Sequence, residues 1–190
     1  ELSTGVVFSL ISWYNLPSLF SVAFDFWILN TFFLFFVSSV LIIIFVYDLQ
    51  HYIIPDKIIF PAILVTTFWR LATAIFYESY QEFTILNGFA SAFGAAAFFF
   101  GIVWLSQGKG MGMGDVKFVI LMGLVLGFPD ILMALLLSFM LGSLVGVLLI
   151  VSGKKGLKSE VPFAPFLVTG TFLVMFWGEY LFQLLGVFRR

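Results

Sequence analysis

The sequence contains no cysteine, and its 190 residues include a single histidine, His51. The absence of cysteine excludes disulfide bonds, thiolate zinc sites and a cysteine nucleophile. One imidazole is also too few for a histidine-rich metal site. We therefore expect no metal centre, and any catalytic chemistry must depend on other side chains.

Charged residues are scarce as well, at 10% of the chain against roughly a quarter in an ordinary soluble domain. Nine Lys and Arg residues and ten Asp and Glu residues give a net charge of −1, so the chain lacks the basic field that holds nucleic acid. In contrast, 62% of the residues are hydrophobic and 20% are aromatic. This composition excludes a water-soluble globule and predicts an all-α, polytopic transmembrane helix bundle in contact with lipid.

Seven apolar segments are each predicted to be a helix, because backbone groups in hydrocarbon must form their hydrogen bonds within the segment. We expect about six to seven spans in a single membrane-embedded domain over residues 1–190. Asn15 and Pro17 interrupt the first segment, the fifth is short, and Arg70 near the far end of the third is expected to snorkel to the membrane surface. The segments are 5–24, 26–47, 58–77, 84–106, 116–128, 131–152 and 166–188.

The lysines predict the orientation, since positively charged residues stay on the cytoplasmic side of a membrane. Six lysines lie in or beside alternate loops, whereas the intervening loops carry acidic residues and no Lys or Arg. We therefore expect the lysine-bearing loops in the cytoplasm, although Arg189 and Arg190 at the other end of the last span disagree with this assignment. The lysines are Lys57, Lys109, Lys117, Lys154, Lys155 and Lys158.

Two aspartates stand at the predicted cytoplasmic ends of spans, Asp48 after the second and Asp115 before the fifth. A carboxylate at a membrane edge is costly and is therefore a functional candidate. Two carboxylates held close in a low-dielectric setting share one proton, which supplies an acid and a base for the attack of water on a peptide carbonyl. The alternative is that Asp48 is a helix-end charge and Asp115 a helix-capping residue.

Four glycines alternate immediately before Asp115, at Gly108, Gly110, Gly112 and Gly114. Such a backbone bends sharply and approaches another chain closely, although a flexible linker has the same composition. The loop has neither the spacing of a phosphate-binding loop nor a strand before it, so we exclude a nucleotide site.

These motifs form a recognisable combination. Tyr47-Asp48 is followed by Pro55-Asp56, and Gly112-Met113-Gly114-Asp115 precedes an apolar span. The combination resembles the GxGD aspartic peptidases of the type IV prepilin leader peptidase family. Segments 1–5 and 161–166 look like the start of that family's membrane domain and its late P-F-G-P-F element, with Ala164 in place of the glycine. The resemblance covers nearly the whole chain.

The resemblance implies that Asp48 and Asp115 are the catalytic aspartates and that Gly112 and Gly114 belong to a supporting substrate loop. The implied substrates are prepilins or pseudopilins, which have a short basic leader before an apolar helix. Cleavage is implied at the cytoplasmic face of the bacterial inner membrane. A hydrogen-bonded helix shields its carbonyls, so the glycine loop is a candidate to hold the substrate in an extended form.

Two supporting residues have alternative interpretations. Asp56 is the rival to Asp48, but Pro55-Asp56-Lys57 is typical of a helix start, so we favour Asp48. Lys117 either biases the pKa of the aspartate pair or marks the cytoplasmic edge of the membrane, and we favour the second interpretation.

No cofactor is implied for peptidase activity. S-adenosylmethionine would be needed only for N-methylation, which the family associates with an amino-terminal cytoplasmic part, often with paired cysteine motifs, that this sequence lacks. The sequence begins at Glu1 without an initiator Met, which indicates a fragment of a longer product or a processed form. The oligomeric state is left open.

Two other functions compete with a peptidase. A proton-coupled transporter also uses paired membrane aspartates, but the inverted repeats common in that class are not visible here. A non-enzymatic subunit of a pilus assembly or secretion machine would carry these aspartates incidentally. That alternative predicts that Asp48→Asn and Asp115→Asn are tolerated.

Overall fold

The computed structural model describes residues 5–7, 9, 24–76, 85–108, 110–153, 161–184 and 186. The chain forms two compact units, Glu1–Ile43 and Ile44–Arg190, and the boundary between them falls inside a helix. The candidate site lies entirely in the second unit. The first predicted segment, 5–24, lies almost wholly outside the described residues, as do four of the lysines on which the predicted orientation depends, Lys109, Lys154, Lys155 and Lys158.

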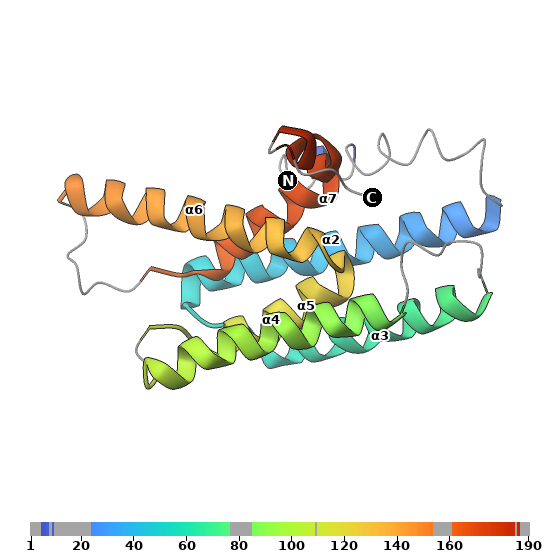
Figure 1. Ribbon diagram of the computed structural model, residues 1–190, viewed down its shortest axis with the longest axis horizontal. Helices are drawn as coiled ribbons and strands as arrows, with labels where there is room; N and C mark the ends of the chain where they lie inside the picture. The colour runs from blue at the N-terminus through green and yellow to red at the C-terminus, as the bar shows by residue number, and fades with distance from the viewer. Residues whose placement is uncertain are drawn as a thin grey trace. The chain divides into compact units, whose positions relative to one another are not determined.

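Every regular element with defined bounds in the described part of the chain is a helix, which confirms the all-α prediction (Figure 1). The predicted helix ends lie within a few residues of the observed ones, because apolar runs stop where charged residues, glycine or proline begin. The helices are α2 (Phe24–His51), α3 (Asp56–Phe76), α4 (Ile85–Leu105), α5 (Met113–Leu126), α6 (Asp130–Val151) and α7 (Ala164–Leu184).

Five helices of the described residues are long and apolar enough to cross a membrane, namely α2, α3, α4, α6 and α7. They make the protein a multi-pass membrane protein. The remaining helix, α5, has only 14 residues. At 1.5 Å per residue it extends about 21 Å, which is less than the roughly 30 Å of a hydrocarbon core.

The short helix α5 lies at the centre of the second unit and contacts α3, α4, α6 and α7. Nine of its 14 residues are buried. The α4–α5 contact is especially close at Gly123, where an added Cβ would lie 2.5 Å from the backbone N and Cα atoms of Ala92. Figure 1 shows α4 and α5 side by side. The glycine therefore lets the two helix backbones approach each other.

The carboxyl end of α5 is bound by polar side chains from α3 and α4. The guanidinium of Arg70 donates hydrogen bonds to the carbonyl oxygens of Leu124 and Val125. The side chain of Asn87 accepts a hydrogen bond from the N–H of Phe128 at 2.6 Å and donates one to its carbonyl oxygen at 2.9 Å. Arg70 is only 6% exposed, so the prediction that it snorkels is wrong. Its guanidinium group supplies hydrogen-bond donors to the last carbonyl oxygens of α5, which have no donor within that helix.

Candidate functional site

Asp48 lies in the last turn of α2, which continues to His51, beyond the predicted end of that span. The chain then turns sharply, since Tyr52 has a left-handed backbone with φ 57° and donates its N–H to the carbonyl oxygen of Asp48 at 2.9 Å. Asp48 is only 5% exposed. The aspartate thus stands at a rigid corner of the fold with its side chain turned away from the surface.

Asp115 lies in the first turn of α5, which begins earlier than predicted, at Met113. It is 9% exposed, and its N–H donates to the carbonyl oxygen of Gly112 at 3.2 Å. Burial, and to a lesser extent the charge of Asp48, raise the pKa of Asp115 to about 7, against the opposing effect of a backbone hydrogen bond from Gly112. The proton of Asp115 is therefore held up to a much higher pH than that of an ordinary aspartate.

The charge of Asp48, on α2, contributes to the raised pKa of Asp115, on α5, so the two carboxyl groups are within electrostatic range of each other. Both are buried. Like charges in such surroundings cannot both ionise cheaply, so the arrangement favours one proton for the pair. The two aspartates that the sequence selected therefore share one site.

The start of α7 contributes a third component of this site. The backbone N–H of Ala164, the first residue of α7, donates a hydrogen bond to Oδ2 of Asp48 at 3.2 Å. The amino end of a helix carries a partial positive charge and free N–H groups, and both stabilise an ionised carboxylate. In the sequence, Ala164 belongs to a motif, but that motif indicates no contact with either aspartate. The flanking prolines, Pro162 and Pro165, mark a helix start but not its partner.

Aromatic side chains hold this start of α7 in place. Phe163, directly before Ala164, packs against Phe139 of α6 with ring centroids 5.2 Å apart and against Phe99 of α4 at 6.4 Å. Phe99 is fully buried, and Ala164 is also buried. The Ala164 N–H is therefore fixed by the core rather than by a loop alone.

The motif glycines pack around Asp115 in different ways. An added Cβ on Gly112 would lie 3.9 Å from Oδ2 of Asp115. An added Cβ on Gly114 would lie 3.2 Å from Cβ of Ile54, in the connection between α2 and α3. Gly114 thus allows the first turn of α5 to dock on the connection that follows Asp48.

The two supporting residues, Asp56 and Lys117, pair with each other. Lys117 Nζ lies 2.6 Å from Oδ1 of Asp56, with 29% and 58% of the respective side chains exposed. The ammonium group also lies 5.2 Å from the centroid of the Phe60 ring. Asp56 is the first residue of α3, as predicted for a helix start. The structure therefore gives Lys117 a partner that neither interpretation of this residue had named.

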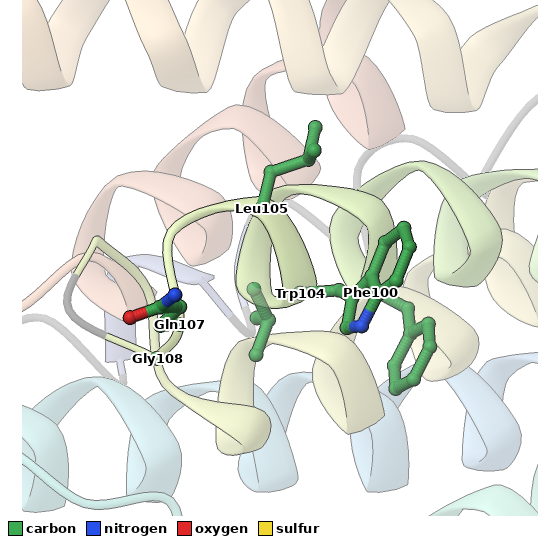
Figure 2. Close-up of a pocket in the computed structure, with 6 residues that line it drawn as sticks. Phe100, Trp104, Leu105, Gln107 and Gly108 are labelled. Carbon is green, nitrogen blue, oxygen red and sulfur yellow. The ribbon is translucent and has the colours of Figure 1, made fainter.

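Other features lie outside the aspartate pair. Among the described residues, no group of three or more His, Cys, Asp or Glu side chains is placed to hold a metal ion. The ring of His51 stacks on Tyr47, with centroids 4.3 Å apart. An open pocket at the end of α4, shown in Figure 2, is lined by residues of that helix and of the turn after it, and neither aspartate lines it. The lining residues are Phe100, Val103, Trp104, Leu105, Gln107 and Gly108.

Comparison with known proteins agrees with the motifs. The sequence profile of the type IV leader peptidase family matches residues 35–147. The chain is 28% identical over 143 residues to the prepilin leader peptidase/N-methyltransferase of Bacillus subtilis (strain 168), covering 74% of this chain and 54% of that protein. It is 37% identical over 93 residues to the protein of the same name from Pseudomonas putida, covering 45% of this chain and 32% of that protein.

A third relative of the same name, from Aeromonas hydrophila, is 27% identical over 144 residues, covering 70% of this chain and 44% of that protein. The chain therefore spans about half, or less, of the length of these relatives. No solved structure matches the chain significantly. Because the family profile includes both Asp48 and Asp115 and covers more than half of the sequence, the chain belongs to the type IV leader peptidase family.

Proposed function

We propose that this protein is a membrane aspartic endopeptidase that removes the leader from type IV prepilins or pseudopilins. The observation that carries the proposal is the buried pair of Asp48 and Asp115, two carboxyl groups from different helices that lie close enough for one charge to act on the other. Such a pair supplies the base and the acid that amide hydrolysis requires.

In the proposed mechanism the two aspartates have different roles. Asp48, which accepts the N–H of Ala164, is ionised and takes a proton from the attacking water. Asp115 carries the shared proton and donates a hydrogen bond to the oxygen of the scissile carbonyl. Water adds to the carbonyl carbon, and a proton then passes to the leaving nitrogen as the C–N bond breaks. The proton taken from water balances the one given to the amine.

The proposed substrate follows from the names of the relatives and from the physics of the membrane. A leader rich in Lys and Arg stays on the cytoplasmic side, and the lysine pattern predicts that the aspartates lie on that side as well. The apolar helix that follows a leader can lie among the spans. The scissile segment must be extended, and the glycine-containing backbone before Asp115 suits such a segment.

The peptidase step needs no cofactor in this proposal, because both the base and the acid are side chains of this chain. The relatives are also named N-methyltransferases, and that reaction would require S-adenosylmethionine. None of the contacts around Asp48 and Asp115 assigns it a residue here. We therefore propose peptidase activity alone.

The proposal is tested by co-expressing the protein with a prepilin of its own genome and measuring leader removal. Asp48→Asn and Asp115→Asn should each lower cleavage on the order of a thousandfold or more, because removal of one member of a catalytic pair disables the unit. Asp56→Ala should retain measurable cleavage. Full cleavage by both Asn variants would contradict the peptidase proposal, and loss of cleavage in Asp56→Ala alone would show that the pair is misassigned.

A further inference from the structure

Two contacts flank Asp115, one with the connection between α2 and α3 and one with the first residue of α3. On one side, Gly114 packs on Ile54, which is buried. On the other side, Lys117 forms its ion pair with Asp56. The start of α5 is therefore held on one side of Asp115 by the connection that follows Asp48 and on the other side by the start of α3.

Several contacts hold the connection between α2 and α3. After α2, Tyr52 turns the chain, Ile54 is buried, and the carbonyl oxygen of Pro55 accepts the N–H groups of Ile58 and Ile59 at 3.0 and 3.2 Å as α3 begins. These contacts order the segment between Asp48 and the start of α3. The place at which α5 docks on the connection therefore determines how far Asp115 stands from Asp48.

Lys117 is placed to act on this docking rather than directly on Asp115. Residues two apart on a helix point to nearly opposite sides, so Lys117 and Asp115 do not face each other. Its ammonium group instead lies 2.6 Å from Oδ1 of Asp56 and 5.2 Å from the centroid of the Phe60 ring, and both residues belong to α3. Both contacts hold α5 against α3.

We propose that the Asp56–Lys117 ion pair is a positioning clamp that sets the separation of Asp48 and Asp115. The inference rests on the proposed peptidase function for its catalytic readout, and it makes Asp56 and Lys117 positioning residues that touch neither the water nor the substrate. A partly exposed ion pair contributes little to overall stability, so its removal should leave the protein folded. Small misplacements of reacting groups are costly, so its removal should still slow cleavage.

The test compares Asp56→Asn, Lys117→Met and the double variant for cleavage of a prepilin in detergent or liposomes. Each single variant should lower kcat at least about tenfold with little change in KM, since the chemistry rather than the binding is disturbed. The double variant should be no slower than the slower single variant, because both changes remove one interaction. Matched controls are Lys57→Met, which removes an exposed charge next to Asp56 but outside the ion pair, and Glu179→Gln, which removes an exposed charge on α7; both should leave kcat unchanged.

Charge exchange gives a sharper result than removal. The variant carrying both Asp56→Lys and Lys117→Asp restores the opposite charges, and it should cleave faster than either of its single components. Single variants within twofold of the original rate would overturn the proposal, and so would losses that multiply in the double variant. A large loss in Asp56→Asn with none in Lys117→Met would also overturn it, because Asp56 would then act alone.

An activity-independent measurement separates this inference from the peptidase proposal. Hydrogen–deuterium exchange should increase in residues 52–58 of Lys117→Met and in residues 112–118 of Asp56→Asn, since each loses its partner across the clamp. This result is expected even if no prepilin is cleaved, in which case only the proposed function fails. Unchanged exchange in both segments would overturn the clamp whatever the protein cleaves.

Discussion

The backbone N–H of Ala164 donates a hydrogen bond of 3.2 Å to the carboxylate of Asp48 and thereby joins the start of α7 to the end of α2. The donor lies at the amino end of α7, where N–H groups have no partner within their own helix. The hydrogen bond therefore satisfies two needs, because it caps a helix and fixes the direction in which Asp48 presents its oxygen atoms.

Removing this donor should slow cleavage without breaking the helix. Ala164→Pro deletes the N–H at a helix start, a position where proline is well tolerated. A hydrogen bond to a charged group contributes about 1.5–3 kcal/mol, so kcat/KM should fall about 10- to 100-fold. Ala164→Gly keeps the N–H and should lose far less activity, with thermal unfolding recorded for both variants. Equal activity of the two variants would show that the hydrogen bond does not orient Asp48.

Cleavage should decrease as the pH rises above neutrality. The pKa of Asp115 is raised to about 7 by burial and by the charge of Asp48, so Asp115 is protonated below that pH and ionised above it. The mechanism needs this proton, and kcat should therefore fall about tenfold per pH unit on the alkaline side. Initial rates from about pH 5 to about pH 9 measure the effect, with circular dichroism as the check on folding. Constant rates to the alkaline end would contradict the role of Asp115 as the acid.

The two aspartates can be identified from the sequence, but the contact of Ala164 with Asp48 cannot. Asp48 and Asp115 could be selected because they stand at the predicted cytoplasmic ends of two spans and belong to the motifs Tyr47-Asp48 and Gly112-Met113-Gly114-Asp115. Ala164 gave no such signal, since its contribution is a backbone N–H that every residue except proline has. Which carboxylate a helix start meets depends on the packing of Phe163, and that packing involves side chains from α4 and α6.

The close approach of α4 and α5 predicts a large effect at Gly123. An added Cβ would lie 2.5 Å from the backbone of Ala92, so the helices would have to separate. Gly123→Ala should therefore destabilise the protein by about 1–3 kcal/mol, measured by thermal unfolding in detergent. Gly94→Ala on α4 is the matched control, because nothing lies within 4 Å of its added Cβ. A Gly123→Ala variant as stable as the control would contradict the observed packing.

The helix ends were largely predictable from the sequence, whereas the buried position of Arg70 was not. Apolar runs end at charged residues, glycine or proline, and these signals are local. The prediction for Arg70 failed because its partners, the carbonyl oxygens of Leu124 and Val125, belong to a helix far along the chain. The last carbonyl oxygens of the short helix α5 have no donor within that helix. Arg70 can supply one because α3 packs beside α5.

Arg70→Met should therefore destabilise the protein and slow cleavage together. The substitution keeps an apolar stem but removes the donors to Leu124 and Val125, and each buried carbonyl left without a partner costs about 1–3 kcal/mol. The other end of α5 carries Asp115, so movement of the helix should also lower kcat. The midpoint temperature of thermal unfolding and the rate of prepilin cleavage, measured on the same preparation, should both decrease.

The control for this prediction is Thr73→Val on the same helix. The Thr73 hydroxyl donates to the carbonyl oxygen of Arg70 at 3.0 Å, within α3, so its loss leaves the contact between α3 and α5 in place. Thr73→Val should have a smaller effect on unfolding and little effect on cleavage. If Arg70→Met and Thr73→Val lowered stability and kcat equally, the effect of Arg70 would lie within α3. The carboxyl end of α5 would then not depend on the guanidinium.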